Sequence, residues 1–337
     1  MIHVGEDLHR TFCYVTALDA NGKVLHQGRI NNERVAIERY LAVGWQEPLR
    51  VVFEACSFWP AFVEAVEGKV AELYMVHPQR VKAIASAKLK NDRVDSLTLA
   101  HLLRADLLPQ AWLADRETRQ RRTRARTRIE LGRMRTRLKN RMHALLHQQG
   151  LRCPYSDVFG KKGRVWLSEA PLGAAEREAL EGYLRLLDSC EEQIRESQRR
   201  LLKATCNDDR VRWLSSIPGI GEYGANIILA EIGDITRFDR KALFSFAGLV
   251  PQVRESADKS WYGPITRAGS SRLRWIMVEA AVTAVRSSPA ARTFFERLCR
   301  RKPRHVARVA LARKLLGAVY ALLRDGVCFD EQVFATM

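Results

Sequence analysis

Four carboxylates in the first third of the sequence have the types and spacing that metal chemistry needs: Asp7, Glu54, Asp92 and Asp95. Asp92 and Asp95 are three residues apart in a segment with a helical pattern, so both project from one face. Converging carboxylates repel one another unless cations lie between them. Hard oxygen ligands select Mg²⁺ or Mn²⁺, and two such ions roughly 4 Å apart hold the attacking and leaving oxygens of a phosphodiester. The sequence therefore predicts a divalent-metal site that acts on nucleic-acid phosphates.

The elements that would position these carboxylates form a mixed α/β pattern. Strands are expected over 2–4, 12–18, 23–29, 50–54 and 71–76, and helices over 32–43 (with an Asn cap), over 59–66, and from just after Asn91 to about 103. The sequence Asp19-Ala20-Asn21-Gly22 predicts a hairpin turn between the second and third strands. Three strands followed by alternating helices and strands predict a mixed sheet with helices on its faces. If the first and fourth strands are neighbours, Asp7 and Glu54 meet at one edge.

A basic helical segment follows. Apolar residues recur at steps of three and four from Leu131 to Leu145, and twelve Lys/Arg accompany two Glu between Arg116 and His143. A loop is expected over 150–173, and a second helix then carries Leu180, Leu187, Ile194 and Leu201 at heptad spacing. These two helices predict an antiparallel hairpin, packed on its own domain, or a coiled-coil arm that dimerises. The sequence leaves both arrangements open.

The last segment predicts a compact α-helical domain. Helices are expected from about 222 to 232 and over 241–248, 272–286, 290–300 and 305–324, with a loop from 250 to 269. Pro218-Gly219-Ile220-Gly221 opens the first of these helices and resembles a helix-hairpin-helix turn. Backbone N–H groups at Gly219 and Gly221 would face a phosphate there. A Pro-Gly turn before a helix is also common without any ligand.

The charge distribution indicates a polyanionic partner. The formal net charge is +18; residues 1–106 carry none of it, residues 107–206 carry +10 and residues 207–337 carry +8. This pattern is typical of a chemical domain followed by two parts that hold nucleic acid. The arginines expected to contact its backbone are Arg122, Arg126, Arg133 and Arg137 in the basic helix, and Arg267, Arg272 and Arg274 in the last segment.

Several protein classes are disfavoured by composition. No apolar run approaches the length of a membrane span, and Glu6 and Asp7 stand where a signal peptide needs an apolar core. The seven cysteines include no CxxC pair, which argues against a zinc ribbon or a redox motif. We therefore expect reduced thiols and a bacterial cytoplasmic, nucleoid-associated protein without a membrane partner.

Several motifs resemble those of the DEDD-type insertion-sequence transposases, which are bridge-RNA-guided recombinases related to the Piv DNA invertase. They are Gly5-Glu6-Asp7-Leu8-His9-Arg10, Val52-Phe53-Glu54-Ala55, and Lys90 to Ser96 with Leu99-Ala100. Arg10 stands where the family usually has Lys, and Cys56-Ser57 replaces its usual Thr-Gly. The resemblance implies a RuvC-like, RNase H-type fold for residues 1–110, a helical coiled-coil connector over 111–206 and an α-helical transposase domain over 207–337. It also implies that Asp7, Glu54, Asp92 and Asp95 are the family's metal-binding quartet.

A serine completes the chemistry that the resemblance implies. Phe246 to Pro251, Gly263 to Gly269, Leu273-Arg274 and Glu279-Ala280-Ala281 resemble the family's C-terminal domain. Ser256 falls where that family keeps its nucleophile, with Ala257 in place of the usual Gly. A serine that attacks a phosphodiester stores the bond energy in a phosphoserine link, so the strand is rejoined without ATP.

The resemblance implies a site-specific DNA recombinase that acts through a 5′-phosphoserine intermediate. The expected partners are donor and target DNA, a structured non-coding guide RNA, and further copies of the chain in a homodimer or homotetramer. Three alternatives remain from the residues alone. They are a RuvC-like hydrolytic nuclease such as a junction resolvase, a protein-only DNA invertase, and a nucleic-acid-binding protein without activity.

Overall fold

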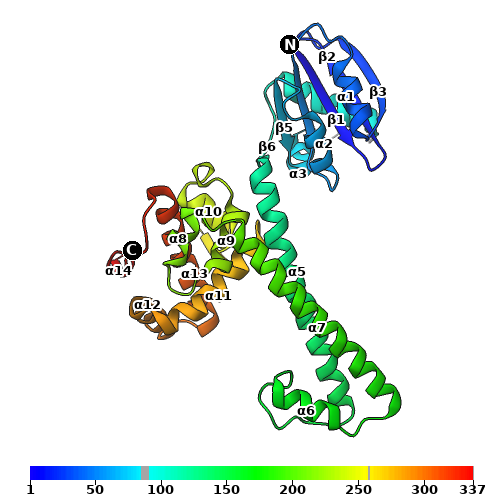
Figure 1. Cartoon of the computed structure of the whole chain (residues 1–337). Coiled ribbons are helices and arrows are strands. Elements are labelled where there is room, and N and C mark those ends of the chain that lie inside the picture. Colours follow the sequence, from blue (N-terminus) through cyan, green and yellow to red (C-terminus); the bar gives the residue numbers. More distant parts are fainter. Residues whose placement is uncertain (85–90, 257–258, 337) are drawn as a thin grey trace. The chain divides into compact units, whose positions relative to one another are not determined.

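The computed structural model describes residues 1–84, 91–256 and 259–336, so Lys90 and Ala257 of the sequence motifs lie outside the described residues. By their contacts these residues form two compact units, Met1–Ala114 and Asp115–Met337, which we describe separately (Figure 1). No described helix combines the length and apolar character needed to cross a membrane.

The first unit is a six-stranded mixed sheet with helices packed on it. Its strands are β1 (Ile2–Leu8), β2 (Phe12–Leu18), β3 (Val24–Asn31), β4 (Leu49–Glu54), β5 (Glu72–Val76) and β6 (Gln110–Ala111), in the spatial order β3-β2-β1-β4-β5-β6. β4 runs parallel to β1 and β5, and the other pairs are antiparallel. Its helices are α1 (Arg34–Ala42), α2 (Trp59–Val66), α3 (Pro78–Ile84) and α4 (Asp92–Arg104).

Two apolar layers hold this sheet together. On one face, Val4, Phe53 and other strand residues pack with Phe62 of α2 and Ile37 of α1. On the other face, Val52 and Val76 pack with leucines of α4. The mixed sheet is the one that the sequence predicts, and this arrangement is compatible with an RNase H-type domain.

The local predictions for this unit were mostly confirmed. Gly22 has φ +86°, and the Asp19 carboxylate accepts hydrogen bonds from two backbone N–H groups of the expected hairpin turn. The predicted cap of α1 was wrong, because Glu33 is its N-cap and the Asn32 side chain donates to the carbonyl oxygen of His9 instead. The short elements α3 and β6 were not predicted.

The second unit is mostly helical. Its helices are α5 (Arg116–Gln148), α6 (Lys161–Glu169), α7 (Ala174–Lys203), α8 (Asp209–Ser215), α9 (Glu222–Ile232), α10 (Arg240–Phe246), α11 (Ser271–Ser287), α12 (Pro289–Cys299), α13 (Arg304–Asp325) and α14 (Glu331–Thr336), with a 3₁₀ turn at Ile235–Arg237. The structure places α6 inside the expected loop over 150–173. That segment opens with two lysines and a glycine and lacks the usual signals of a helix start.

The heptad residues of α7 are buried within the chain. Leu180 and Leu187 pack with Met142 and Leu146 of α5, and α5 and α7 lie side by side (Figure 1). The structure therefore supports the antiparallel hairpin of the two sequence-based arrangements. The N-terminal part of α5 joins a separate core through Ala125 and Ile129, which pack among α9, α11 and α13.

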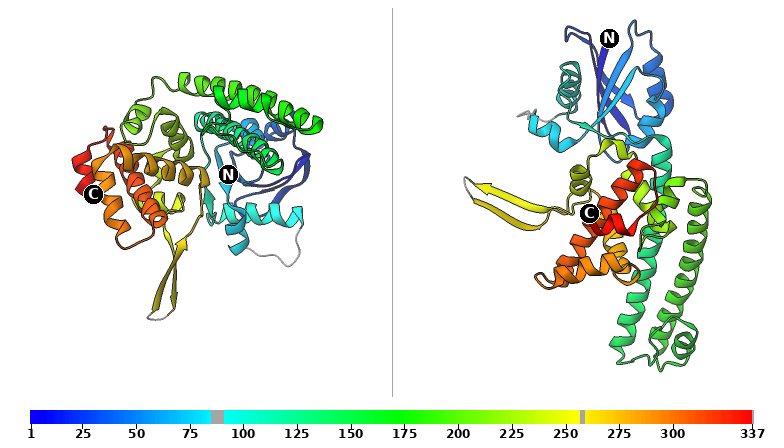
Figure 2. Two further views of the ribbon diagram at one scale, coloured as in Figure 1. Left: turned by 90° about the horizontal axis from the view of Figure 1, so that it is seen from below. Right: turned by 90° about the vertical axis from the view of Figure 1, so that its left-hand side faces the viewer.

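A two-stranded antiparallel sheet stands where the sequence predicts a loop. It consists of β7 (Pro251–Ser256) and β8 (Lys259–Ile265), so this unit is not purely helical. Figure 2 shows the hairpin extending away from the helices of its own unit. β8 shows no alternation between apolar and polar residues, and β7 alternates only over its first four residues, so the usual strand signal is weak.

Candidate metal and nucleic-acid site

The sheet brings Asp7 and Glu54 to one face of two neighbouring strands. Glu6 of β1 is paired with Phe53 of β4 in the parallel register, and both are buried. Because side chains alternate across a strand, the next residues, Asp7 and Glu54, lie on the opposite face. That face is the one covered by α4. The prediction that the first and fourth strands are neighbours is therefore confirmed.

Helix α4 begins with the other two carboxylates. Asn91 caps it by accepting a hydrogen bond from the N–H of Val94 at 2.8 Å, so Asp92 and Asp95 lie in its first turn. The helix lies very close to β1 because Gly5 has no side chain. A Cβ atom at Gly5 would lie 2.2 Å from the carbonyl oxygen of Ser96.

A buried hydrogen bond also fixes α4 on the sheet. The hydroxyl oxygens of Thr16 in β2 and Ser96 are 2.8 Å apart. This contact and the close approach at Gly5 both act within one turn of Asp92 and Asp95. They set how far these carboxylates stand from Asp7.

His9 is a site residue that the sequence analysis did not single out. Its Nε2 lies 3.2 Å from Oδ2 of Asp7 and 3.3 Å from Oδ1 of Asp92. Its ring stacks on Phe12 at 4.5 Å, and its carbonyl oxygen accepts the 2.7 Å hydrogen bond from Asn32. The one signal for His9 in the sequence was its spacing from Asp7. Residues two apart in an extended chain project to the same side, so the two side chains are expected to be neighbours.

The electrostatics of Asp7 reflect this crowding. Burial raises the pKa of the Asp7 carboxyl, the nearby His9 ring lowers it, and the charges of Asp92 and Asp95 raise it. A guanidinium nitrogen of Arg29 lies 3.5 Å from Oδ2 of Asp92, and Arg29 also stacks over Phe12 at 4.3 Å. Asp95 thus acts on Asp7 through its charge, while Glu54 reaches the same face through strand register.

These residues fit a divalent cation. One ligand atom from each of Asp7, His9 and Asp92 lies within 4.8 Å of the others. The carboxylate oxygens of Asp7 and Asp92 are the hard ligands that Mg²⁺ and Mn²⁺ prefer, and the His9 nitrogen lies within reach of the same point. A cation among them would favour the ionised form of Asp7, which burial and the charges of Asp92 and Asp95 disfavour.

Ser256 is the last residue of β7. Its Cα partner in the hairpin is Lys259 of β8, so the serine lies at the far end of the strand from Pro251. The sequence predicts a loop at this serine, whereas the structure places it at the end of a strand. Ser256 and the carboxylates belong to different compact units.

The two glycines of the predicted phosphate-binding turn differ in their surroundings. Gly219 has φ +88°, and a Cβ atom there would lie 2.3 Å from the carbonyl oxygen of Ala280 in α11. The close packing of this turn against α11 therefore explains the glycine at position 219 without any phosphate ligand. Gly221 is the N-cap of α9, and a Cβ atom there would meet no atom within 4 Å.

The four arginines predicted along α5 divide into two pairs. The Arg122 guanidinium donates to the carbonyl oxygens of Ala230 and Glu231 at the end of α9, and Arg126 forms two hydrogen bonds to the buried Glu231 carboxylate, at 2.9 and 3.1 Å. These contacts give Arg122 and Arg126 a role in packing. Arg133 and Arg137 are exposed further along the helix, and Arg133 pairs with Glu130.

The three arginines near the hairpin also differ. Arg274 donates to the carbonyl oxygens of Ala247 and Ala268, which ties down the chain on both sides of the hairpin. Arg272 lies 3.8 Å from a carboxylate oxygen of Glu130. Arg267 is exposed at φ +54°, a left-handed conformation that few residues other than glycine adopt.

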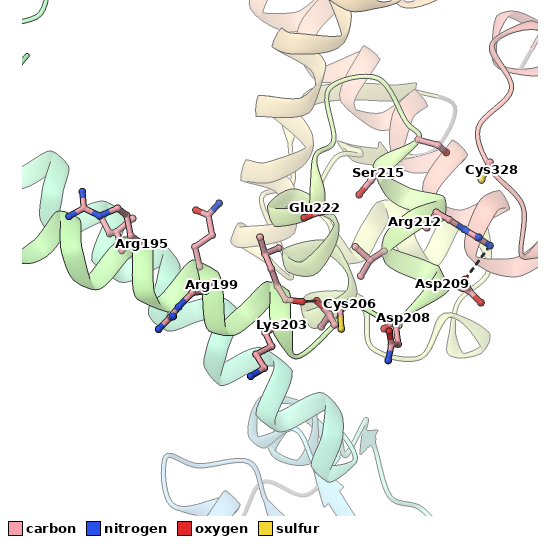
Figure 3. A pocket seen from close by; sticks show the side chains of 17 residues that line it. Arg195, Arg199, Lys203, Cys206, Asp208, Asp209, Arg212, Ser215, Glu222 and Cys328 are labelled. Carbon is pink, nitrogen blue, oxygen red and sulfur yellow. Dashed lines mark hydrogen bonds and ion pairs between the residues drawn. The ribbon is translucent and has the colours of Figure 1, made fainter.

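A cavity of about 1140 Å³ lies where the end of α7 meets α8 (Figure 3). Its wall carries both signs of charge, with Arg199, Lys203 and Arg212 beside Asp208 and Asp209. Figure 3 shows the ion pair between Arg212 and Asp209, at 3.1 Å. Since these charges offset one another, the cavity shows no preference for an anion.

The chain is similar to known transposases along most of its length. A family model described as "Transposase", of the DEDD type, matches residues 4–150, and one described as "Transposase IS116/IS110/IS902 family" matches residues 211–296. The "Transposase for insertion sequence element IS1111A" of Coxiella burnetii is 27% identical, over 95% of this chain and 89% of its own. The "Transposase for insertion sequence element IS1328" of Yersinia enterocolitica is 25% identical, over 97% and 98%.

Proposed function

Because the chain belongs to the IS110 family of DEDD transposases, we propose that it cuts and rejoins DNA through a 5′-phosphoserine link at Ser256. The observation that carries this proposal is the meeting of Asp7, His9 and Asp92 in a chain of this family. In the proposed organisation, residues 1–110 are a RuvC-like catalytic domain. Residues 111–206 are a helical connector, and residues 207–337 are the domain that bears the serine.

The proposed step exchanges one phosphate ester for another. The Ser256 hydroxyl gives its proton to a general base, and its Oγ attacks the phosphorus of a DNA strand. The 3′-oxygen takes up a proton and departs as the free 3′-hydroxyl. A different 3′-hydroxyl then attacks the phosphoserine and returns the serine hydroxyl. The number of ester bonds is unchanged in each step, which is why no ATP is required.

The proposed role of the acidic quartet is to hold Mg²⁺ or Mn²⁺ at Asp7, Glu54, Asp92 and Asp95. A bound divalent ion lowers the pKa of a coordinated hydroxyl and offsets charge that develops on phosphate oxygens. Asp7 and Asp92 are held at ligand distance from each other by β1 and by α4, while the His9 ring beside them lowers the pKa of Asp7. We propose that the serine meets this quartet in a composite site, within one chain or between two.

The proposed partners follow from family membership and charge. A transposase acts on DNA, here a donor and a target. A structured non-coding guide RNA would suit the exposed cationic surface of α5, including Arg133 and Arg137, which is able to contact a backbone without reading bases. A homodimer or homotetramer would bring two DNA strands together for exchange. Gly221, at the start of α9, and Arg272 remain candidates for phosphate contacts.

The acidic quartet by itself also suits a hydrolytic nuclease, in which water replaces the serine, and a protein-only invertase would use the same serine without RNA. Replacing Ser256 by Ala separates hydrolysis from strand transfer. In the proposed mechanism Ser256→Ala abolishes both the covalent protein–DNA adduct, detected by denaturing electrophoresis, and strand exchange. Ser271→Ala, an exposed serine at the start of α11, is the matched control and retains both. An adduct formed by Ser256→Ala would refute the serine assignment.

The guide is tested by sequencing nucleic acid that purifies with the protein. One discrete non-coding RNA is the expected result. Recombination by protein freed of RNA would favour the invertase.

A further inference from the structure

A groove of about 730 Å³ lies at the foot of the β7–β8 hairpin. The first residue of β7, Pro251, and the last residue of β8, Ile265, form part of its wall. Helices α10, α12 and α13 supply most of the rest, together with Leu249 and Arg267 beside the hairpin, so the whole groove belongs to the second unit. No residue of the acidic quartet takes part.

The groove combines an apolar floor with a cationic rim. Phe244 and Phe294 contribute aromatic surface, and Arg240, Arg267, Arg313 and Lys314 surround it. The Arg313 guanidinium carbon lies 4.9 Å from the centre of the Phe244 ring, and the Lys314 Nζ lies 4.7 Å from that of Phe294. Its lining contains no Asp or Glu.

The cations of this rim have no acidic partner among the described residues. Arginines elsewhere in the unit have carboxylate partners, as Arg126 has in Glu231 and Arg164 in Asp188. Among the residues that the structure describes, no carboxylate pairs with any of the four rim cations. Burial, followed by the charge of Arg297, lowers the pKa of Lys314, so the charged form of this side chain is disfavoured in the absence of an anion. An anion bound here would remove that repulsion.

We propose that this groove holds an unpaired nucleotide of the DNA strand that is cleaved. A base has a flat face that packs on the partly exposed Phe294 and on the guanidinium groups that cover the buried Phe244 ring, and its flanking phosphates carry the negative charge that the rim lacks. A volume of this size accommodates a nucleoside. A base in a duplex is already stacked and paired, so the ligand is a nucleotide taken out of the helix.

The hairpin connects this groove to the proposed nucleophile. Ser256 is five residues beyond Pro251 along β7, a distance of about 17 Å in an extended strand. A strand bound in the groove therefore runs within a few nucleotides of the serine. The choice of DNA over RNA rests on the proposed function, since the strand that reaches Ser256 is the one that is cut.

The test measures the affinity of the full-length protein for a short fluorescein-labelled single-stranded DNA by anisotropy. Arg313→Glu is expected to weaken binding by about tenfold, because one phosphate contact is replaced by repulsion. Val306→Glu places a carboxylate at a 41% exposed position in the same groove and is expected to act in the same direction. The matched control is Arg308→Glu, an exposed arginine of α13 outside the groove, which is expected to change affinity by less than about twofold.

Each other outcome overturns the groove assignment. Equal losses for Arg313→Glu and Arg308→Glu would mean a general charge effect. A loss confined to RNA of the same sequence would make RNA the ligand, and an equal loss for duplex DNA would remove the need for an unpaired nucleotide. Thermal melting must first show that the variants fold like the wild type; if Arg313→Glu does not, Val306→Glu decides.

Failure of the groove and failure of the proposed function are distinguishable. Ser256→Ala is expected to bind the oligonucleotide like the wild type, because it changes no groove residue. If Arg313→Glu binds normally while the wild type forms the covalent adduct, the groove assignment falls and the phosphoserine mechanism stands. If the wild type forms no covalent adduct while Arg313→Glu loses affinity, the phosphoserine mechanism falls and the groove assignment stands.

Discussion

The backbone of Gly5 in β1 passes so close to Ser96 in α4 that a Cβ atom at Gly5 would lie 2.2 Å from the Ser96 carbonyl oxygen. The nitrogen of Ala100 is nearly as close, at 2.5 Å. Both neighbouring atoms are backbone, so neither is free to rotate away. The spacing of α4 from the sheet, and with it the spacing of Asp92 and Asp95 from Asp7, depends on this glycine.

Gly5→Ala is accordingly expected to destabilise the first unit by about 1–3 kcal/mol, because α4 must move away from β1. The separation of the carboxylates should also weaken Mn²⁺ binding, measured by calorimetry. Gly28→Ala in β3 is the matched control, since its Cβ atom would meet only the His26 ring at 3.5 Å, an ordinary contact. Equal stability of the two variants in chemical denaturation would contradict the role of the close approach.

His9 is expected to contribute to cation binding. Because its Nε2 lies within 3.3 Å of carboxylate oxygens from both Asp7 and Asp92, His9→Ala should weaken Mn²⁺ binding by about tenfold. Asp92→Asn, which removes a ligand charge, should weaken it further. Glu64→Gln, an exposed carboxylate of α2, serves as the control and should bind as the wild type does. Wild-type affinity in His9→Ala would exclude the histidine from the site.

Glu6 predicts a specific dependence of stability on pH. Burial raises the pKa of this carboxyl from its ordinary 4.5 to about 8, and neither of its oxygens has a hydrogen-bond partner among the described residues. Between these values the folded state keeps a proton that the unfolded state has released. The free energy of unfolding should therefore fall by about 1.4 kcal/mol per pH unit over this range and level off above it.

Glu6→Gln should remove this slope, since glutamine does not titrate. The measurement is urea denaturation of both proteins in EDTA at several pH values between 4.5 and 8. Other groups titrate in both proteins, so the informative quantity is the difference between the two curves. A constant difference across the range would show that Glu6 does not titrate as its burial requires.

Arg126 and Arg137 should behave in opposite ways although both lie on α5. Arg126→Ala leaves the buried Glu231 carboxylate with the Ser270 hydroxyl but without its ion-pair partner, and should cost about 2 kcal/mol of stability. Arg137 is exposed, so Arg137→Ala should leave the melting temperature unchanged while weakening nucleic-acid binding. Melting and salt-dependent anisotropy on the same samples test both statements. Loss of affinity without loss of stability in Arg126→Ala would reverse the assignment.

The sequence by itself determined the local elements and the chemistry they carry. Apolar periodicity predicted the main strands of the first unit, α2, α4 and most of the long helices, because each of these buries a face with a regular period. Asn91 was predicted to precede α4, and it caps that helix, because capping is a local interaction. The residue types of the acidic quartet indicated a cation before any coordinates did.

Only the tertiary structure decided which side chains meet. The placement of His9 beside Asp92 depends on residues 83 positions apart, and no local pattern encodes such a contact. The same holds for Arg126, whose Glu231 partner comes from another helix and gives this expected binding residue a packing contact. The β7–β8 hairpin was not predicted because β8 lacks the alternation by which strands are recognised and β7 shows it over only four residues.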